Sequence, residues 1–461
     1  MVVARHTWAA LQGRRKLKIV WDLPENPEGS PELNAKLEAA LDREGKSYRS
    51  EGDIEAALAS APTKLTARYR TPFLVHAPME PPACTALVTD TGCEIWAPTQ
   101  NPQRARSEAA KTLGLSESKV TVHVTLLGGG FGRKSQPDFV LEAVAIAAEL
   151  KGKPVKLTWT REDEIRHGFY HAESAHRLDA GIDVAGKLVA WRHRSAFPTI
   201  QSLFTTLNLN PGDFEMKMGA TTLPYAIPNL SVEGVSEPSE VRIAWLRAVC
   251  NLFHSFAINS FLDEIAHAKA VSPVDLRLQL LKPHGILPSD AKSDFPLDTG
   301  RMARVIEKVA TASEFSRPRK KGMGVGFASH FSFFSYVAAA VEAQVVEGNI
   351  QVTAIDCSID CGRMVNPDTV RAQMEGAMVF GLSLALHGKI TLDKGVVRQS
   401  GFHDYPLLRM AEMPKIRVHL IESEAHPAGV GEPGVPPVAP ALANAVFAAT
   451  GKRLRELPLR L

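Results

Sequence analysis

The sequence predicts an α+β protein in which helices and mixed strands form layers. Helical and strand patterns alternate along the chain, and they do so without a repeating period. At 461 residues the chain is also too long for one compact core, so we expect more than one domain. Changes in composition place the domain borders, which give segments 1–62, 63–318 and 319–461.

The first segment, residues 1–62, has too little apolar surface to fold alone. MVVA at its start and KLKIVWDL at 16–23 have strand-like patterns, and TWAALQGRRK between them can form a helix. Such short elements need a larger sheet to complete them. The rest is rich in Pro, Glu, Gly and Ser, which is typical of a linker, with one helical patch, ELNAKLEAALDRE. We interpret the segment as the remnant of a preceding small α/β domain plus a linker.

The second segment, residues 63–318, mixes strands and helices. Helices are predicted at 101–113, DFVLEAVAIAAELKG, 251–270 and from SPVDLRLQLL onward, and loops fill 198–244. Strands are predicted in TARYRTPFLVHAPMEP, CTALVTD, CEIWAPTQ, KVTVHVTLLGG, PVKLTWTRED, HRLDAGIDV and KLVAWRHRSA.

The third segment follows SRPRKKG, residues 316–322, which we interpret as a solvated linker rather than a polyanion site. One long helix is predicted at DTVRAQMEGAMVFGLSLALHG and a closing helix at 438–451. Strands are predicted in GMGVGFAS, YVAAAVEAQVVEG, NIQVTAIDCSIDCG and KIRVHLIES.

Composition excludes several classes of protein. The net charge of +3 gives no large basic surface for nucleic acid. No apolar run reaches the about 18 residues of a membrane helix, and no signal peptide follows Met1. Five cysteines suggest no disulfide framework. Cys357 and Cys361 share one face of a predicted strand, and we expect them to be buried small side chains rather than ligands of a metal or an iron–sulfur cluster.

The stretch GVGEPGVPPVAPALAN, residues 429–444, contains the pattern G-x-G-x-x-G. Five residues separate it from the strand before, and Pro436 and Pro437 prevent a helix from starting where phosphate would bind, so a dinucleotide site is disfavoured. The glycines and prolines instead form a stiff loop that holds Glu432 among valines. Apolar surroundings raise the pKa of a carboxyl group, as a general base requires. The alternative is a turn glutamate that caps the next helix or faces water.

A second glycine-rich loop, LLGGGFGRKSQPDF at 126–139, lies between a predicted strand and a helix. Backbone N–H groups and the helix dipole converge there, although the glycine spacing does not match a P-loop. Three glycines before Phe131 allow the backbone to approach a ligand closely, with one aromatic ring beside it. The alternative is a tight turn with a packed phenylalanine.

Two further sets of polar residues lie in apolar or mixed surroundings. Arg247 is the lone cation amid the apolar residues of IAWLRAVC, so it must meet a carboxylate, carbonyl groups or a substrate oxygen, with a structural salt bridge as the default. His167, His171 and His176 lack the spacing of a zinc-binding helix and are more typical of strand and turn residues.

Four stretches in this order carry a resemblance: MEPPACTA, GGGFGRK, the lone arginine in its apolar run, and GVGEPGVPPVAPALANA. They resemble the large subunit of molybdenum hydroxylases, the xanthine dehydrogenase and aldehyde oxidase family, in its isoquinoline 1-oxidoreductase beta-subunit branch. EIWAPTQNPQ, DCGRMVNPDTVRAQMEGAMVFGLS and GFHDYPLLRM extend it over nearly the whole chain. The resemblance implies that segments 63–318 and 319–461 are two molybdopterin-binding domains, the second of which carries Glu432.

The resemblance also implies a cofactor and roles for residues. The cofactor is molybdopterin, as its cytosine dinucleotide, and no protein side chain binds its molybdenum. Glu432 corresponds to the general base, and Arg247 to an arginine that orients substrate oxygens in some members. Glycines 128–130 and 132, with Phe131 and Gly431, correspond to residues at the cofactor and the substrate. The implied reaction hydroxylates an aromatic N-heterocycle with oxygen from water, or oxidises an aldehyde to a carboxylic acid.

The sequence departs from the family pattern in two places. Full-length subunits carry a Gly-Gln-Gly loop and Gly/Ser-rich segments that hold the pterin, and this chain has none, so it resembles the C-terminal half of the large subunit and needs a partner chain. Leu74 stands near the position of a family glutamine, whose contact is therefore not transferred. The family also implies a small [2Fe-2S] subunit, because this chain has no cysteine set for a cluster, and in this branch a cytochrome c.

A competing hypothesis is a non-catalytic structural subunit that keeps the fold without the cofactor. The joint presence of Glu432, Phe131 and the loop glycines favours the catalytic interpretation. The sequence leaves the compartment open between the cytoplasm and, if the complex is exported on a partner's twin-arginine signal, the periplasm.

Overall fold

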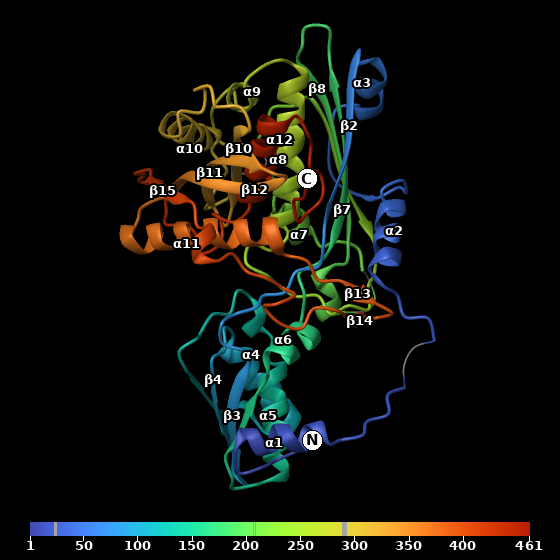
Figure 1. Ribbon diagram of the computed structural model, residues 1–461, viewed down its shortest axis with the longest axis vertical. Coiled ribbons are helices and arrows are strands. Elements are labelled where there is room, and N and C mark those ends of the chain that lie inside the picture. Colours follow the sequence, from blue (N-terminus) through green and yellow to red (C-terminus); the bar gives the residue numbers. More distant parts are fainter. Residues whose placement is uncertain (23–24, 206, 208, 288–292) are drawn as a thin grey trace. The chain divides into compact units, whose positions relative to one another are not determined.

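The computed structural model describes residues 1–22, 25–205, 207, 209–287 and 293–461 (Figure 1). Contacts divide the chain into two compact units, each made of segments that are distant in sequence. The smaller unit contains Met1–Glu32, His76–Gly168 and Thr391–Gly401, and the larger unit contains Leu33–Val75, Phe169–Ile390 and Phe402–Leu461. The predicted borders at 63 and 319 stay a prediction.

The smaller unit is a four-stranded sheet covered by helices. Its strand order is β5-β4-β3-β6, with β4 and β5 parallel and the other pairs antiparallel. Alternating buried residues of the strands meet a continuous apolar face of α5, as the amphipathic patterns predict. The elements are α1 (Thr7–Arg15), β3 (Ala83–Val88), β4 (Cys93–Ala97), α4 (Pro102–Leu113), β5 (Val120–Val124), α5 (Asp138–Glu149), β6 (Val155–Thr158), α6 (Arg161–His167), β13 (Leu392–Asp393) and β14 (Val396–Val397).

The N-terminal helix is confirmed, but the predicted strands on either side of it are wrong. Residues 1–4 and 16–22 form no strand, and Leu23 lies outside the described residues. A strand needs a neighbour for its N–H and C=O groups, and within the described chain these segments pair with none. Their apolar side chains stay exposed, Val20 at 96% and Trp21 at 71%.

The larger unit contains two sheets. The first has the order β1-β9-β8-β7-β2, in which only β8 and β9 are parallel. Two of its strands, β1 and β9, fall in stretches predicted to be linker or loop. Its elements are α2 (Ser30–Ala40), β1 (Lys46–Glu51), α3 (Ile54–Ser60), β2 (Thr63–Thr71), β7 (Ser174–Ile182), β8 (Leu188–Phe197), α7 (Asp213–Lys217) and β9 (Asn229–Ser236).

The second sheet has the order β10-β11-β12-β15, with β15 parallel to β12. Helix α12 packs on β10 and β11, and α10 packs on β11 and β12 (Figure 1). Its elements are α8 (Asn251–Ala268), α9 (Pro273–Leu280), α10 (Thr299–Ala312), β10 (Met323–Ser332), β11 (Ser335–Val346), β12 (Asn349–Asp360), α11 (Pro367–His387), β15 (Lys415–Leu420) and α12 (Val438–Thr450).

Helix α8 joins the two sheets of the larger unit. It contacts β2 and β7 of the first sheet, β10 of the second, and α12 (Figure 1). This position buries the helix on almost every side, including polar side chains such as His254, Asn259 and Asp263. The fold is thus α+β, as predicted, and the long helices lie within a few residues of their predicted bounds.

Glycines on β10 allow α12 to lie against its backbone. A Cβ atom at Gly326 would stand 2.1 Å from the carbonyl oxygen of Ala441 and 2.2 Å from the nitrogen of Ala445. No larger residue fits there without moving the helix. This close approach fixes the start of α12, and with it the loop that precedes α12.

Among the described residues, no helix combines the length and the apolar character needed to cross a membrane.

Candidate active site around Glu432

Glu432 lies on the loop between β15 and α12. The loop contains no helix or strand, yet residues 433–437 are all buried. Its first residue is held by the turn between β10 and β11: Gly429 N donates to Phe333 O at 3.0 Å, and Ser335 Oγ donates to Gly429 O at 2.6 Å. The loop is therefore stiff, as its glycines and prolines predict.

The buried side of the loop packs on α11. Val435, Ala248 and Ala377 form a small apolar cluster beneath it. A Cβ atom at Gly434 would lie 2.7 Å from Ala377 Cβ and 3.1 Å from Met374 Sδ, so only glycine allows the loop to approach the helix this closely. The base of the loop thus has one well-defined position.

One carboxylate oxygen of Glu432 accepts a hydrogen bond from the described residues, and the other accepts none. Oε2 accepts a hydrogen bond from the backbone N–H of Ala248 at 2.6 Å. Oε1 accepts none from any described residue. Burial raises the pKa of the Glu432 carboxyl above its ordinary value, and the Ala248 N–H and the Arg247 guanidinium oppose part of this rise. The structure therefore favours the raised pKa expected from the valine-rich surroundings.

Arg247 holds the same loop. Its Nε donates to Gly431 O at 2.6 Å, and its Nη2 donates to Gln373 Oε1 at 3.1 Å. The guanidinium also lies over the ring of Phe380, 5.6 Å from the centroid. Of the partners that the sequence allowed, the structure provides carbonyl and amide oxygens rather than a salt bridge. A substrate-binding role for Arg247 stays a prediction.

The second glycine-rich loop belongs to the smaller unit, between β5 and α5. Gly128 and Glu80 bond reciprocally: Gly128 N donates to Glu80 Oε2 at 2.9 Å, and Glu80 N donates to Gly128 O at 3.0 Å. Gly132 N donates to Gln100 Oε1 at 3.1 Å. The N–H groups of Gly129 and Gly130 bond to no described residue, so they are available to a ligand that offers oxygen atoms.

Phe131 is half-buried and has a backbone φ of 54°, in the left-handed region that a bulky residue rarely adopts. Gly129 and Gly132 on either side also have positive φ values, of 94° and 103°. Strained residues of this kind cluster at ligand-binding sites. Phe131 and Glu432 belong to different units, and the role of Phe131 at the cofactor and the substrate stays a prediction.

Of the three histidines in RHGFYHAESAHR, His171 and His176 are buried in the core, whereas His167 ends α6 and is exposed. His171 Nε2 donates to Val249 O at 3.0 Å, and His176 Nδ1 lies 3.1 Å from His193 Nε2. No group of three or more His, Cys, Asp or Glu residues in the described chain is placed to bind a metal ion. Cys357 and Cys361 are buried and unpaired, as expected.

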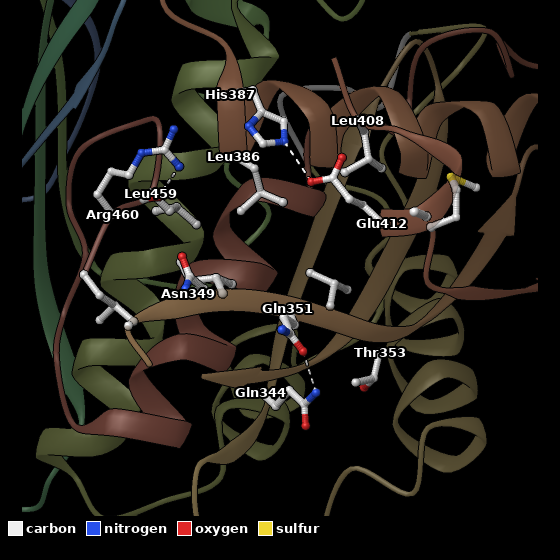
Figure 2. Close-up of a pocket in the computed structure, with 16 residues that line it drawn as sticks. Gln344, Asn349, Gln351, Thr353, Leu386, His387, Leu408, Glu412, Leu459 and Arg460 are labelled. Atoms are coloured by element: carbon white, nitrogen blue, oxygen red, sulfur yellow. Dashed lines mark hydrogen bonds and ion pairs between the residues drawn. The ribbon is translucent and has the colours of Figure 1, made fainter. Parts of the chain in front are cut away.

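A cavity of about 630 Å³ lies elsewhere in the larger unit (Figure 2). Its wall includes the ends of β11, β12 and α11, where His387 Nε2 stands 3.6 Å from Glu412 Oε1, and Gln344 donates to Gln351 at 2.8 Å. None of the site residues predicted from the sequence lines it. The cavity is therefore separate from the Glu432 loop.

Two residues that shape the site were not predicted from the sequence. Ala248 supplies the hydrogen bond to Glu432, and Gln373 anchors Arg247. The only signal for Gln373 was its place in the stretch DCGRMVNPDTVRAQMEGAMVFGLS, and none pointed to Ala248. A backbone donor leaves no trace in residue type, so its role depends on the tertiary fold alone.

Family models match most of the chain. Residues 33–281 and 267–414 match two models described as the molybdopterin cofactor-binding domain. The chain is 30% identical to isoquinoline 1-oxidoreductase subunit beta of Brevundimonas diminuta, over 100% of this chain and 59% of that one. It is 29% identical to the membrane-bound aldehyde dehydrogenase (pyrroloquinoline-quinone) of Gluconacetobacter polyoxogenes, over 100% of this chain and 62% of that one. It therefore spans about six tenths of the length of these relatives.

A solved structure has the same fold. Quinoline 2-oxidoreductase from Pseudomonas putida 86 superposes with a TM-score of 0.83 at 15% identity, over 99% of this chain and 83% of that one. At this identity the likeness concerns the fold. The family models cover more than half of the chain and include α11 and the Arg247 turn. The chain thus belongs to the molybdopterin cofactor-binding family of the molybdenum hydroxylases.

Proposed function

We propose that this chain forms part of the large subunit of a molybdenum hydroxylase and that Glu432 is the general base of the reaction. The observation that carries the proposal is the state of its carboxylate. One oxygen is fixed by the Ala248 N–H, the other accepts no bond from the described residues, and burial raises the pKa. A positioned, partly desolvated carboxylate is what proton abstraction requires.

When bound, molybdopterin supplies the two-electron redox chemistry of such a reaction. The residues of this chain handle the proton and hold the components. Glu432 would accept at Oε1 a proton from the water-derived group whose oxygen is transferred to the substrate. Its Oε2 keeps the hydrogen bond from the Ala248 N–H, and this bond fixes the direction of Oε1. Arg247 keeps the loop in place through Gly431. The N–H groups of Gly129 and Gly130 bind oxygen atoms of the cofactor.

Two substrate classes have support. The relative named for isoquinoline favours hydroxylation of an aromatic N-heterocycle. The relative named as an aldehyde dehydrogenase favours oxidation of an aldehyde to a carboxylic acid. We propose both classes as candidates and place the N-heterocycle first. Both relatives match over this whole chain, and the isoquinoline relative is 30% identical whereas the aldehyde dehydrogenase is 29% identical.

The proposed enzyme contains further chains. This chain spans 59% of the isoquinoline relative, and in our proposal the remaining part of the large subunit helps to hold the cofactor as its cytosine dinucleotide. A small [2Fe-2S] subunit, and in this branch a cytochrome c, takes up the electrons. The complex works in the cytoplasm, or in the periplasm when a partner carries a twin-arginine signal.

Replacing Glu432 tests the proposal. In Glu432→Gln, purified with its partner chains, we expect an unchanged molybdenum content and a turnover lower by roughly 100-fold or more, because the base is lost while the loop keeps its shape. Glu412→Gln, in the cavity of Figure 2, is the control and keeps normal turnover. Full activity of Glu432→Gln refutes the role of the base. A wild-type complex that contains no molybdenum favours the non-catalytic structural subunit instead.

A further inference from the structure

The backbone that contacts Glu432 adopts an unusual conformation. Ala248 and Val249 have φ values of 80° and 48°, so two successive residues other than glycine lie in the left-handed region. For a β-branched residue such as Val249 this is a true outlier. Both residues are buried, at 0% and 5% exposure. A strained buried turn persists only where its surroundings fix it.

Two buried side chains fix this turn. His171 Nε2 donates to Val249 O at 3.0 Å, and Asn251 Nδ2 donates to Ala248 O at 3.0 Å. They come from different parts of the larger unit, His171 from the segment before β7 and Asn251 from the first turn of α8. Each side chain is 2% exposed, so neither bond competes with water.

A third residue sets the orientation of the asparagine. His330 on β10 lies with Nε2 at 2.8 Å from Asn251 Oδ1. Because Asn251 uses its NH₂ group on Ala248 O, its Oδ1 must accept, and His330 must carry its proton on Nε2. The same argument applies to His171, whose Nε2 faces the carbonyl of Val249. Both imidazoles are therefore neutral donors with one defined tautomer.

We propose that His171 and Asn251 are positioning residues for Glu432. They hold residues 248 and 249 in the left-handed conformation, and this conformation directs the Ala248 N–H at Glu432 Oε2. The N–H favours the ionised carboxylate and leaves Oε1 unobstructed. Their role as positioning residues rests on the proposed function of Glu432 as a base. Their effect on the protonation of the Glu432 carboxyl does not depend on that function.

The charges around the Glu432 carboxylate and the His171 imidazole allow a clear test. Arg247 is the charged side chain whose field acts on Glu432 in the described structure. His171 packs against the ring of Phe253 and faces the imidazole of His254. Burial lowers the pKa of His171 to about 4, so it stays a neutral donor at neutral pH. A change in the protonation of Glu432 on mutation of His171 therefore reports the turn and not a lost charge.

The experiment follows the protonation of Glu432 by chemical labelling. A water-soluble carbodiimide with an amine labels carboxyl groups at a rate that depends on their protonation, and mass spectrometry compares the peptide that contains Glu432 with a peptide that contains an exposed reference carboxyl in the same sample. The ratio of the two labelling rates gives the midpoint of Glu432 as a function of pH. We expect the midpoint of the purified complex to rise by about one pH unit in His171→Phe, because the carboxylate loses a charge-assisted hydrogen bond. His171→Gln, which retains an N–H donor, brings the midpoint back toward wild type. His387→Gln, in the cavity of Figure 2, leaves it unchanged.

Other outcomes decide between the alternatives. An unshifted midpoint in a folded His171→Phe complex overturns the proposal. If that variant does not fold, Asn251→Ala removes the other anchor and supplies the same test, and an unshifted midpoint there overturns it equally. In turnover assays the basic shift must appear in the pH profile of kcat, with KM nearly constant. Full activity of Glu432→Gln refutes Glu432 as the base, yet a shifted midpoint in His171→Phe still supports the turn, so the two failures are distinguishable.

Discussion

At the scale of single residues, the site depends on bonds to backbone atoms. The loop of Glu432 is held by Ala248 N, by Gly431 O and by Phe333 O rather than by pairs of charged side chains. Backbone groups sit on rigid elements and lose little freedom when they bond. A carboxylate held in this way keeps its direction through a reaction in which its charge changes.

Replacing Arg247 tests its role in this arrangement. Because the guanidinium bonds to Gly431 and Gln373, we expect Arg247→Met to lower kcat by roughly tenfold or more on every substrate. The measurement compares kcat and KM for two aromatic substrates that differ by one ring oxygen substituent. A loss confined to the oxygen-bearing substrate contradicts the loop-holding role and supports the substrate contact that the family resemblance implies.

A buried acid outside the site offers a second prediction. Glu173 is 4% exposed, and burial raises the pKa of its carboxyl to about 8, with Arg70 opposing the rise. A folded-state pKa above the unfolded value means that stability is full at acid pH and is lost as the pH rises toward 8. We expect Glu173→Gln to raise the free energy of unfolding at pH 8 by roughly 1–3 kcal/mol, and by less at pH 5. Urea titrations at both pH values check this prediction. An equal difference in the free energy of unfolding between the variant and the wild type at pH 5 and pH 8 contradicts it.

Glu173 also illustrates the limits of sequence reasoning about residues. In RHGFYHAESAHR only the histidines were considered as functional residues, and nothing in the sequence distinguishes Glu173 from an exposed acid. Only the fold shows that the acid is buried and that His171 anchors the turn beside Glu432. The stiff loop that carries Glu432 was predictable, because its glycines and prolines are visible in the sequence, whereas the role of Glu432 as a base stays a prediction.

At the scale of elements, the contact between β10 and α12 is the tightest that we describe. We expect Gly326→Ala to lower the free energy of unfolding by about 3 kcal/mol or more, because the new methyl group meets the backbone of α12 at 2.1 Å. It should also lower turnover, since α12 begins where the Glu432 loop ends.

Gly376 on α11 is the matched control for this prediction. A Cβ atom there meets nothing within 4 Å, so Gly376→Ala should stabilise the helix by roughly 0.5–1 kcal/mol. Thermal unfolding of both variants checks the pair. A Gly326→Ala variant as stable as wild type means that the helix can shift without cost, and contradicts the argument.

Elements with strong periodicity were predictable, and elements that depend on partners were not. Helices α5, α11 and α12 match their predicted ranges within about three residues at each end. Strands β1 and β9 pair with each other, yet both lie in stretches rich in turn-forming residues and were predicted as linker or loop. The KLKIVWDL stretch shows the reverse, because its strand-like pattern finds no partner in the described chain. Strand formation is decided by a neighbour that local sequence does not reveal.

At the scale of the whole molecule, the interior of the larger unit is rich in histidine. Each of these side chains is at most 6% exposed, and they come from β7, β8, α8, β10 and the segment before β7: His171, His176, His193, His254 and His330. Burial lowers the pKa of His171 and His254 to about 4 and that of His330 to about 3. His176 and His193 shift in the same direction. The core therefore contains a group of uncharged imidazoles.

This group predicts a steep loss of stability in mild acid. Below pH 6.5 the unfolded chain binds protons that the folded core excludes, so the free energy of unfolding falls with pH down to about pH 4. Each histidine contributes up to about 1.4 kcal/mol per pH unit in this range. Urea midpoints measured from pH 7 to pH 5 should decrease, and His193→Gln should flatten the decrease. A constant midpoint contradicts the prediction.

The packing of α12 also bears on how the polypeptide matures during synthesis. The apolar face of β10 and β11 receives its cover from residues 438–450, which a ribosome adds about 100 residues after those strands. Until then the nascent protein exposes the glycine-lined groove into which this helix fits. A shortened translation product that ends before residue 438 would keep that face open and become a substrate for chaperones or proteases.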